Sequence, residues 1–377
     1  PGGVRVDVAG LVGRVGDLVG TSVVDPVSVW SIDLCHNWRR VGTVDSFEFH
    51  GIERWLEPGE WALECAASAV EWGTIYDPDT GRTVTARPDD VDTIRLVRDR
   101  EIVYAGYVVP VSEGVGGLEL TWDDAGQRLA WSGMDLWDVL RRRVAYPDPD
   151  QEPHLWADAY HVVSGVASTV VATYVEANLG VAALDERQID GFGVADQQEG
   201  PQIEWQARLQ PLSELAARIC ADAELGLWLT VDWDGEVAAR IGRPRDRSDR
   251  IVLSDQGDLS RVQVRRVPAQ ATMTIAGGTG EGTSRVFRVA DTGAVGASRR
   301  EAFSDQSSIA DAGTLTAAAV ANTRLSGETW AVYGEVTDET AQALRYGQDL
   351  QLGDLITIEV AGKRHKVPVT SAAFEIS

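Results

Sequence analysis

Residues 93–111, TIRLVRDREIVYAGYVVPV, contain two runs of β-branched and aromatic residues separated by the polar triplet Arg98-Asp99-Arg100. Apolar and polar residues alternate on both sides of that triplet, as they do in strands that bury one face. The stretch therefore predicts an antiparallel β-hairpin, and it indicates the fold class of the region around it.

Two further strand pairs are predicted on either side of this hairpin. Residues 44–68 place two short apolar segments around Glu57-Pro58-Gly59, and residues 116–124 and 127–135 alternate in the same way. Residues 135–143, DLWDVLRRR, have the spacing of a short amphipathic helix. Several short strands joined by turns predict a small barrel or sandwich.

A proline-rich segment ends this pattern. Residues 146–153, YPDPDQEP, contain three prolines, which neither a helix interior nor a central strand tolerates. Apolar residues then recur at helical spacing in residues 164–180 and 211–226. In the second of these helices, Ser213 is the predicted N-cap and Gly226 the predicted end.

The pattern returns to strands after these helices. Residues 227–241 read as a hairpin, and the pair Asp234-Gly235 predicts a type I′ turn. From Ile251 to the end the chain is again β-rich, with one helical interruption at residues 307–327. The predicted fold is mainly β with α+β, as two barrel-like modules separated by an α+β domain. The predicted parts are an arm (1–25), a first β-barrel-like domain (26–147), an α+β domain (148–250) and a second β-rich barrel-like domain with a helical insertion (251–377).

Charge and composition limit the functions that this chain can have. Its 34 basic and 58 acidic residues give a formal charge of −24, and only Lys363 and Lys366 are lysines. Such an acidic surface repels phosphate backbones, so sequence-specific nucleic-acid binding is not expected, whereas a wall that DNA must pass without adhering would be acidic. No apolar run approaches the roughly 18 residues of a membrane span, and we expect no signal peptide and no membrane anchor.

The cysteines indicate a reducing place of synthesis. The three residues are far apart and have no C-x-x-C spacing, so neither a disulfide framework nor a zinc site is predicted. They are Cys35, Cys65 and Cys220. We expect synthesis in the cytoplasm.

The glycine-rich stretch 275–285, IAGGTGEGTSR, raises the question of a nucleotide site. A phosphate-binding loop of the Walker type requires a lysine, and no lysine lies between residues 1 and 362. A dinucleotide fingerprint requires G-x-G-x-x-G before a helix, whereas Gly278, Gly280 and Gly282 precede an alternating, strand-like segment. The stretch is therefore predicted to connect two antiparallel strands of the second barrel-like module.

Other candidate sites are weak. The acidic loops at residues 77–81, 148–150 and 232–236 lack the glutamate that completes an EF-hand, and they are interpreted as turns. No histidine belongs to an H-E-x-x-H or H-x-H motif; the five are His36, His50, His154, His161 and His365. The paired carboxylates could in principle serve a glycosidase, but such pairs are expected by chance in so acidic a chain. They are Asp89/Asp90, Asp123/Asp124 and Glu57/Glu60.

No nucleophile motif such as G-x-S-x-G is present either. We therefore predict no catalytic, cofactor-binding or metal-binding residue, no cofactor, and no enzymatic activity. Thirteen tryptophans are spread along the whole chain, which favours core and subunit-interface positions over a stacking array. They are Trp30, Trp38, Trp55, Trp61, Trp72, Trp122, Trp131, Trp137, Trp156, Trp205, Trp228, Trp233 and Trp330.

Seven segments together resemble the minor tail proteins of actinobacteriophage siphoviruses, in order along the chain from about Trp30 to Ile376. They are residues 30–68, 94–108, 129–149, 167–180, 209–229, 260–289 and 344–360. The resemblance implies a tail-tip or baseplate hub: a homotrimer in which each chain supplies two related β-barrels, so that three chains form a pseudo-sixfold ring that continues the tail tube. Residues 1–25 fall outside it and are interpreted as an arm on a neighbour.

The resemblance also implies a location and partners. We expect a structural protein of the virion, at the phage tail tip, that adapts sixfold to threefold symmetry and lines or closes the DNA channel. Its expected partners are two further copies of itself, the distal tail protein ring, the tape measure protein and other tail-tip or fibre proteins. The alternatives are a tail-associated peptidoglycan hydrolase, which needs a nucleophile, metal or carboxylate pair, and a host carbohydrate-binding tail protein, which needs an exposed aromatic cluster.

Overall fold

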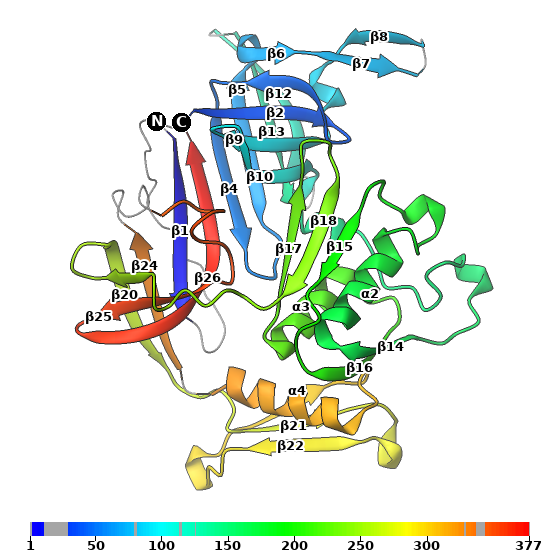
Figure 1. Ribbon diagram of the computed structural model, residues 1–377, viewed down its shortest axis with the longest axis vertical. Coiled ribbons are helices and arrows are strands. Elements are labelled where there is room, and N and C mark those ends of the chain that lie inside the picture. Colours follow the sequence, from blue (N-terminus) through cyan, green and yellow to red (C-terminus); the bar gives the residue numbers. More distant parts are fainter. Residues whose placement is uncertain are drawn as a thin grey trace.

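The computed structural model describes residues 2–10, 29–78, 81–112, 115–124, 126–327, 329–336 and 344–376. Within them the protein is mainly β, as predicted. Figure 1 shows three parts: a long sheet that contains both ends of the chain, an α+β body beside it, and a small three-stranded unit covered by one helix.

The hairpin predicted at residues 93–111 is present. β9 (Thr93–Arg98) pairs antiparallel with β10 (Glu101–Val108), and Arg98 lies opposite Glu101. The two residues between them, Asp99 and Arg100, have φ angles of 51° and 69°. Positive φ at both central positions is the type I′ arrangement, whose twist matches that of paired strands. A turn without glycine therefore forms the predicted hairpin.

The other predicted strand pairs of the first region are also formed. β4 pairs with β5, and β12 pairs with β13, both antiparallel. The helix α1 (Asp138–Arg141) follows. The strands are β2 (Trp30–His36), β3 (Arg39–Val44), β4 (Glu48–Arg54), β5 (Glu60–Ala66), β6 (Val70–Trp72), β7 (Thr74–Asp77), β8 (Arg82–Thr85), β11 (Pro110–Ser112), β12 (Val115–Asp123) and β13 (Gly126–Asp135).

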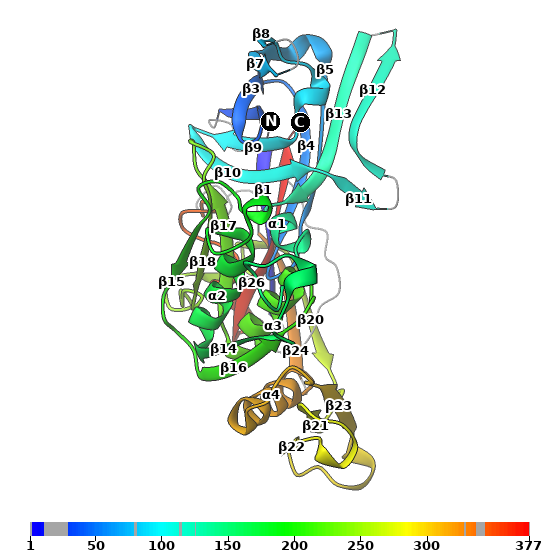
Figure 2. The same cartoon turned by 90° about the vertical axis from the view of Figure 1, so that its right-hand side faces the viewer.

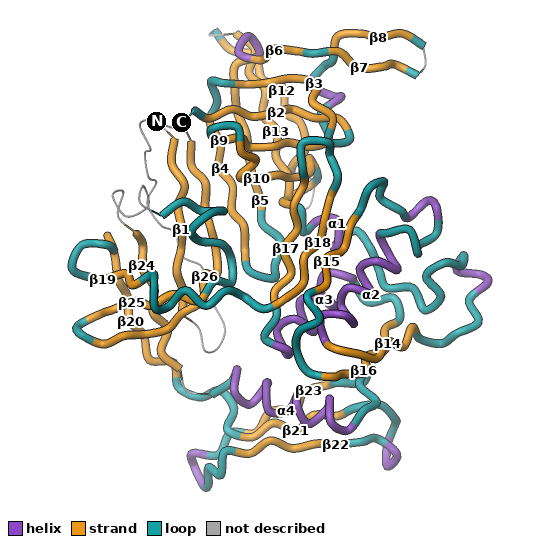
Figure 3. Tube along the Cα trace, in the orientation of Figure 1, coloured by secondary structure: helices purple, strands orange, loops and turns teal. Residues whose placement is uncertain are grey.

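The first and last regions share one sheet. The C-terminal strand β26 (Lys363–Ile376) pairs with β4 on one side and with the N-terminal strand β1 (Gly2–Gly10) on the other. β1 also pairs with β24 (Thr329–Val336), which pairs with β20 (Leu259–Val267). β19 (Val252–Ser254) and β25 (Leu355–Val360) extend the other half of β26. Figure 3 shows β1, β26 and β4 side by side.

This pairing corrects the interpretation of the N-terminal arm. Residues 2–10, predicted as part of an arm on a neighbouring subunit, pair instead with two strands of their own chain, β24 and β26. Residues 11–25 of the predicted arm lie outside the described residues. The boundaries drawn at residues 147 and 250 stay predictions.

A row of aromatic rings forms the core of the shared sheet. Phe49 lies 6.4 Å from Trp61 and 5.6 Å from Tyr104, whose ring lies 5.3 Å from Phe374, and Phe374 lies 5.7 Å from Tyr346. Each such pair contributes roughly 0.5–1.5 kcal/mol beyond its buried area. Since Phe374 and Tyr346 belong to the C-terminal region, one continuous core joins the two ends of the chain.

The predicted barrel-like modules would each be a sheet closed on itself. The pairings between the described strands run from β20 to β6 as an open path, with β12 and the β19–β25 pair branching from it. The coarse mainly β class is therefore confirmed, whereas the division into two closed barrels stays a prediction.

The α+β body contains both predicted helices. α2 (Ala167–Leu179) and α3 (Leu212–Ala223) pack against each other and against two small sheets. The hydroxyl of Tyr174 on α2 lies 2.8 Å from the carbonyl oxygen of His161 and 2.9 Å from that of Trp205, which ties the helix to the strands below it. The strands are β14 (His161–Val166), β15 (Gly193–Asp196), β16 (Gln202–Ala207), β17 (Gly226–Val231) and β18 (Val237–Gly242).

Three details of this body differ from the prediction. The N-cap position of α3 is Pro211, not Ser213, and no side chain caps it. The residue after the helix is Glu224, whose φ of 56° gives the left-handed conformation expected of a glycine. The hairpin turn between β17 and β18 is not type I′, because only Gly235 has positive φ. The side chain of Asp232 accepts hydrogen bonds from the backbone of the next turn residues, which stabilises a type I turn followed by a glycine bulge.

The predicted insertion is larger than a helix. α4 (Ala312–Leu325), capped by the side chain of Asp311, covers one face of the sheet β22-β21-β23. These strands are β21 (Met273–Gly277), β22 (Phe287–Asp291) and β23 (Glu301–Asp305). The unit lies beyond the α+β body at one end of the molecule (Figures 1 and 2), and α4 contributes to the core of that body.

Candidate functional site at the junction of three regions

A cavity of about 480 Å³ lies where the first region, the α+β body and the C-terminal region meet. Its walls come from β4, β10, the end of β13, β17 and residues 346–352. Four ionisable side chains of the lining have raised pKa values: Glu53, Tyr104, Asp135 and Tyr346. Perturbed groups in a cavity mark a candidate functional site, and we call these four residues the junction site.

Glu53 is the residue of the junction site that titrates near neutral pH. The hydroxyl of Tyr346 donates a hydrogen bond to Glu53 Oε2 at 2.6 Å. Burial raises the pKa of Glu53 to about 7, and this hydrogen bond lowers it only in part. Its side chain is half-buried and faces the cavity. Burial therefore favours the protonated form of Glu53 over a wider pH range than for an exposed glutamate.

Asp135 is held by the backbone. Burial is the main cause that raises the pKa of Asp135, and the charge of Glu53 raises it further. Hydrogen bonds donated by the backbone amides of Gly59 and Trp137 lower it in part. These amides lie 2.8 Å and 3.0 Å from the two carboxylate oxygens. Position 59 admits only glycine, since a Cβ atom there would lie 1.7 Å from the carbonyl oxygen of Ile52.

Tyr104 completes the junction site without a hydrogen bond. Its hydroxyl is buried and has no partner among the described residues. Burial raises its pKa, and the neighbouring Asp135 and Glu53 raise it further. A buried polar group without a partner costs roughly 1–3 kcal/mol. Packing of the Tyr104 ring against Phe49 and Phe374 offsets this cost.

Two tryptophans connect the three regions beside the cavity. The ring of Trp55, after β4, lies 5.5 Å from that of Trp228 on β17, whose Nε1 donates to the carbonyl oxygen of Leu352 at 2.9 Å. The guanidinium of Arg240 lies 3.8 Å above the Trp228 ring. A Cβ atom on Gly353 would lie 2.3 Å from Trp55, so the close approach requires glycine at that position.

The junction site has two carboxyl groups, which is the minimum for acid–base hydrolysis of a glycosidic bond. Glu53 can donate or accept a proton near pH 7, whereas both oxygens of Asp135 already accept backbone hydrogen bonds. The geometry therefore fits a structural role of Asp135 better than that of a free base. The sequence did not single out this pair, because its two members are far apart in the chain and each lies near a strand end among many other acids.

The glycine-rich loop has no phosphate cradle. It connects β21 to β22, which are antiparallel, as predicted, but in the small unit and not in the long sheet. The guanidinium of Arg285 folds back and donates to the carbonyl oxygens of Gly278 and Gly277 at 3.0 Å and 2.9 Å, and it also pairs with Asp305. These contacts fill the space inside the loop.

The remaining candidates are dispersed. His36 lies 3.3 Å from Asp92 and His154 lies 3.2 Å from Glu152, whereas the ring of His161 packs on Tyr174. The three cysteines are buried and free. In the part of the chain that the structure describes, no group of three or more His, Cys, Asp or Glu side chains is placed to hold a metal ion. None of its described helices is both long and apolar enough to cross a bilayer.

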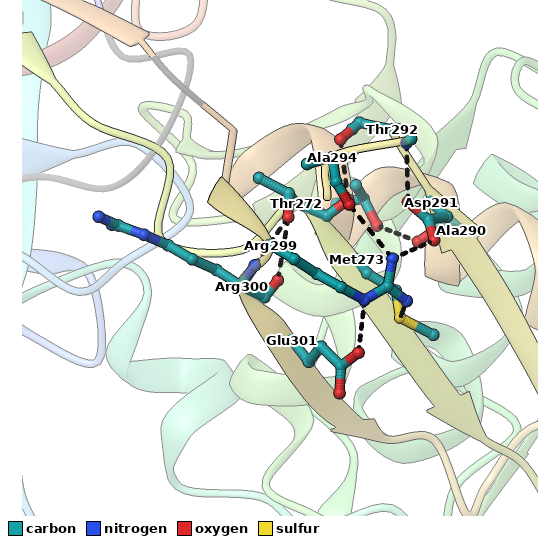
Figure 4. A network of polar contacts seen from close by, with 11 residues as sticks. Thr272, Met273, Ala290, Asp291, Thr292, Ala294, Arg299, Arg300 and Glu301 are labelled. Atoms are coloured by element: carbon teal, nitrogen blue, oxygen red, sulfur yellow. Dashed lines mark hydrogen bonds and ion pairs between the residues drawn. The ribbon is translucent and has the colours of Figure 1, made fainter. Parts of the chain in front are cut away.

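A polar network orders one end of the small unit. Arg299 donates to Asp291 at 2.8 Å and to Glu301 at 2.6 Å, from the loop between β22 and β23 (Figure 4). At the other end, Arg285 lies 5.8 Å from the ring centre of Phe287 and 5.5 Å from that of Phe303. Both rings are about half exposed, on the face of the sheet opposite α4.

Comparison with known proteins identifies the family. Residues 26–376 match the model of the siphovirus ReqiPepy6 Gp37-like proteins. The chain belongs to this family. No curated protein matches the chain.

Two solved structures with a similar fold are phage tail proteins. A tail protein from Neisseria meningitidis MC58 is 14% identical with a TM-score of 0.53, covering 92% of this chain and 95% of its own. The 43 kDa tail protein of prophage MuSo2 from Shewanella oneidensis is 13% identical with a TM-score of 0.54, covering 92% and 97%. Together with the family match, this likeness confirms the predicted resemblance to siphovirus tail proteins.

Proposed function

We propose that this Gp37-like protein is a structural component of the phage tail tip, a hub that assembles as a trimeric ring, continues the tail tube and surrounds the DNA channel. One observation carries the proposal: β26 pairs with β4, so the first and last regions form one continuous wall of strands within each chain. A chain with two such regions in one sheet is suited to supply two successive segments of a ring. Three chains would then present six segments to a sixfold tail.

The charge of the chain agrees with this role. A net charge of −24 favours a wall that a DNA phosphate backbone passes without binding. The expected partners remain the distal tail protein ring, the tape measure protein and other tail-tip or fibre proteins, and the expected location remains the virion. Solution mass measurement or imaging of isolated tail tips tests the proposal, with three copies expected. Six identical copies per ring would refute it.

A peptidoglycan hydrolase is the second candidate, because the junction site contains Glu53 with a pKa of about 7 beside Asp135. We propose that the protein is not an enzyme, since each oxygen of Asp135 already accepts a backbone hydrogen bond that fixes its position. Zymography on purified cell walls separates the two: we expect no lysis band. A band that disappears in Glu53→Gln and persists in Glu48→Gln, an exposed residue of the same strand, would favour the hydrolase.

A carbohydrate-binding tail protein is the third candidate. This function requires an exposed aromatic cluster, and Phe287 and Phe303 are two exposed aromatic side chains that both lie within 6 Å of the Arg285 guanidinium, at 5.8 Å and 5.5 Å. Sedimentation of the protein with host cell walls tests it. Loss of a bound fraction in the double variant Phe287→Ala/Phe303→Ala would support a glycan-binding face, whereas equal sedimentation of both proteins would exclude it.

A further inference from the structure

We infer that β20, at one end of the pairing path of the long sheet, and β12, which branches from β13, pair with each other between neighbouring copies of this chain. The inference rests on the proposed ring and names the strands that would join its subunits. From β20 to β12, eight described strands follow one another as paired neighbours, in the order β20-β24-β1-β26-β4-β5-β13-β12. The sheet of one copy would continue directly into the sheet of the next.

Among the described strands, β20 and β12 each have one edge without a paired strand along most of their length. β20 pairs only with β24 among the described strands. β12 pairs with β13 along residues 117–123, and its pairing with β11 is confined to Val115 and Gly116. Exposed, unpaired edges of this length attract another strand unless charged side chains, proline, a bulge or a covering element blocks them. Neither β12 nor β20 contains lysine or proline, and the bulge of β20 lies near its start, between Leu259 and Arg261. The charges on the two strands have opposite signs, arginine on β20 and acidic residues on β12, so they can pair with each other. At the end of the main pairing path, β6 has only three residues.

The direction of the strands is correct for a head-to-tail contact. All seven pairings from β20 to β12 are antiparallel, so these two end strands run in opposite directions. When a copy is repeated by rotation, its β20 therefore meets the β12 of its neighbour antiparallel. Such a heterologous contact closes into a ring when the rotation permits it.

The side chains of the two edges are complementary. On the core-facing side, β12 exposes 39% of Leu120 and 68% of Trp122, and β20 exposes 39% of Val264 beside the partly buried Val262. The opposite side carries the exposed Glu119 on β12 and the exposed Arg265 on β20.

One antiparallel register satisfies both sides of the sheet. Placing Arg265 opposite Glu119 also places Val264 opposite Leu120 and Val262 opposite Trp122. Apolar residues would continue the core face across the junction, and opposite charges would pair on the other face. Cross-strand pairs of these kinds stabilise antiparallel sheets, and like charges at the same positions destabilise them.

Charge reversal in the full-length protein tests the pairing. We expect Glu119→Arg and Arg265→Glu each to raise the concentration needed for trimer formation roughly tenfold or more, measured by analytical ultracentrifugation, because each places like charges opposite one another. Combining both substitutions restores opposite charges and should recover wild-type assembly. Far-UV circular dichroism and thermal melting check that each variant is folded.

Cysteine cross-linking tests the register independently of affinity. The pair Val264→Cys/Leu120→Cys places two thiols opposite each other, within the Cα separation that a disulfide spans. The three native cysteines are buried. Oxidation with copper–phenanthroline should give a ladder that stops at the trimer. The control Val264→Cys/Thr121→Cys points its thiols to opposite faces and should remain unlinked.

The outcomes separate this inference from the proposed ring. A wild-type trimer whose formation is unaffected by the charge reversals, and which gives no cross-link in the Val264→Cys/Leu120→Cys variant, overturns the strand pairing but leaves the ring. A protein that stays monomeric and unlinked contradicts both. A ladder that continues far beyond three supports the pairing but shows an open filament, and it contradicts the ring.

Discussion

The pKa of Glu53 predicts how the stability of the protein depends on pH. Burial raises this pKa from 4.5 to about 7. A difference of one in pKa between the folded and the unfolded chain corresponds to about 1.36 kcal/mol of stability. Ionisation of Glu53 therefore costs the folded state at most about 3 kcal/mol. The partial exposure of Glu53 to solvent reduces the figure. Glu53→Gln removes the ionisation and keeps an oxygen that accepts the Tyr346 hydroxyl.

The sign follows from the direction of the change in pKa. Below pH 4.5, Glu53 is protonated in both the folded and the unfolded chain, and it costs nothing. Between pH 4.5 and about 7 the unfolded chain loses its proton first, so the wild type becomes less stable as pH rises. Above pH 7 the difference is constant. We therefore expect Glu53→Gln to match the wild type near pH 4.5 and to exceed it by up to about 3 kcal/mol at pH 8.

Urea unfolding followed by fluorescence at several pH values measures this difference, with an unchanged slope showing that the same surface unfolds. Glu48→Gln is the matched control, because Glu48 is exposed on the same strand, and it should leave the pH dependence unchanged. The reasoning is refuted if Glu53→Gln is no more stable than the wild type at pH 8. It is equally refuted if the gain is the same at pH 4.5.

Other substitutions test the packing around this site and the small unit. Tyr346→Phe removes the hydrogen bond to Glu53 and should lower the free energy of unfolding by roughly 1–3 kcal/mol at pH 8. The loss should be smaller at pH 4.5, because a protonated Glu53 carries no charge for the hydroxyl to stabilise. The same urea series measures both values. Gly59→Ala forces a Cβ atom against the carbonyl oxygen of Ile52 and should yield misfolded protein or a loss above roughly 3 kcal/mol, whereas a normal melting curve would contradict the tight contact. Asp311→Ala removes the cap of α4 and should cost about 1 kcal/mol in thermal unfolding, with no change if the cap is dispensable.

Local structure followed closely from local sequence. The alternation around Arg98-Asp99-Arg100 was sufficient for the hairpin β9–β10, because adjacent strands joined by a short turn need no distant partner. The helices α2 and α3 likewise follow from apolar spacing. Their ends were less predictable: the N-cap position of α3 is Pro211, two residues before the predicted Ser213, and helix ends vary by one or two residues more readily than helix centres.

The junction site could not be predicted in this way. Glu53 and Asp135 lie at the ends of two strands and titrate abnormally only because folding removes them from water together with Tyr346, nearly three hundred residues away in the chain from Glu53. In a sequence with 58 acidic residues, no local pattern distinguishes these two. Desolvation is a property of the packed core, not of a residue's neighbours in sequence.

The mainly β class, the local hairpins and helices, the strongly negative charge and the resemblance to siphovirus tail proteins all follow from the amino-acid sequence. Each depends on residue order and composition alone. The tertiary structure decided which distant strands meet. β1 enters between β24 and β26, β26 joins β4, and the glycine-rich loop lies in a separate small sheet. Strand pairing between distant segments depends on hydrogen bonds that any backbone can make. Side-chain patterns therefore predict that a segment is a strand, but they do not predict which distant strand it pairs with.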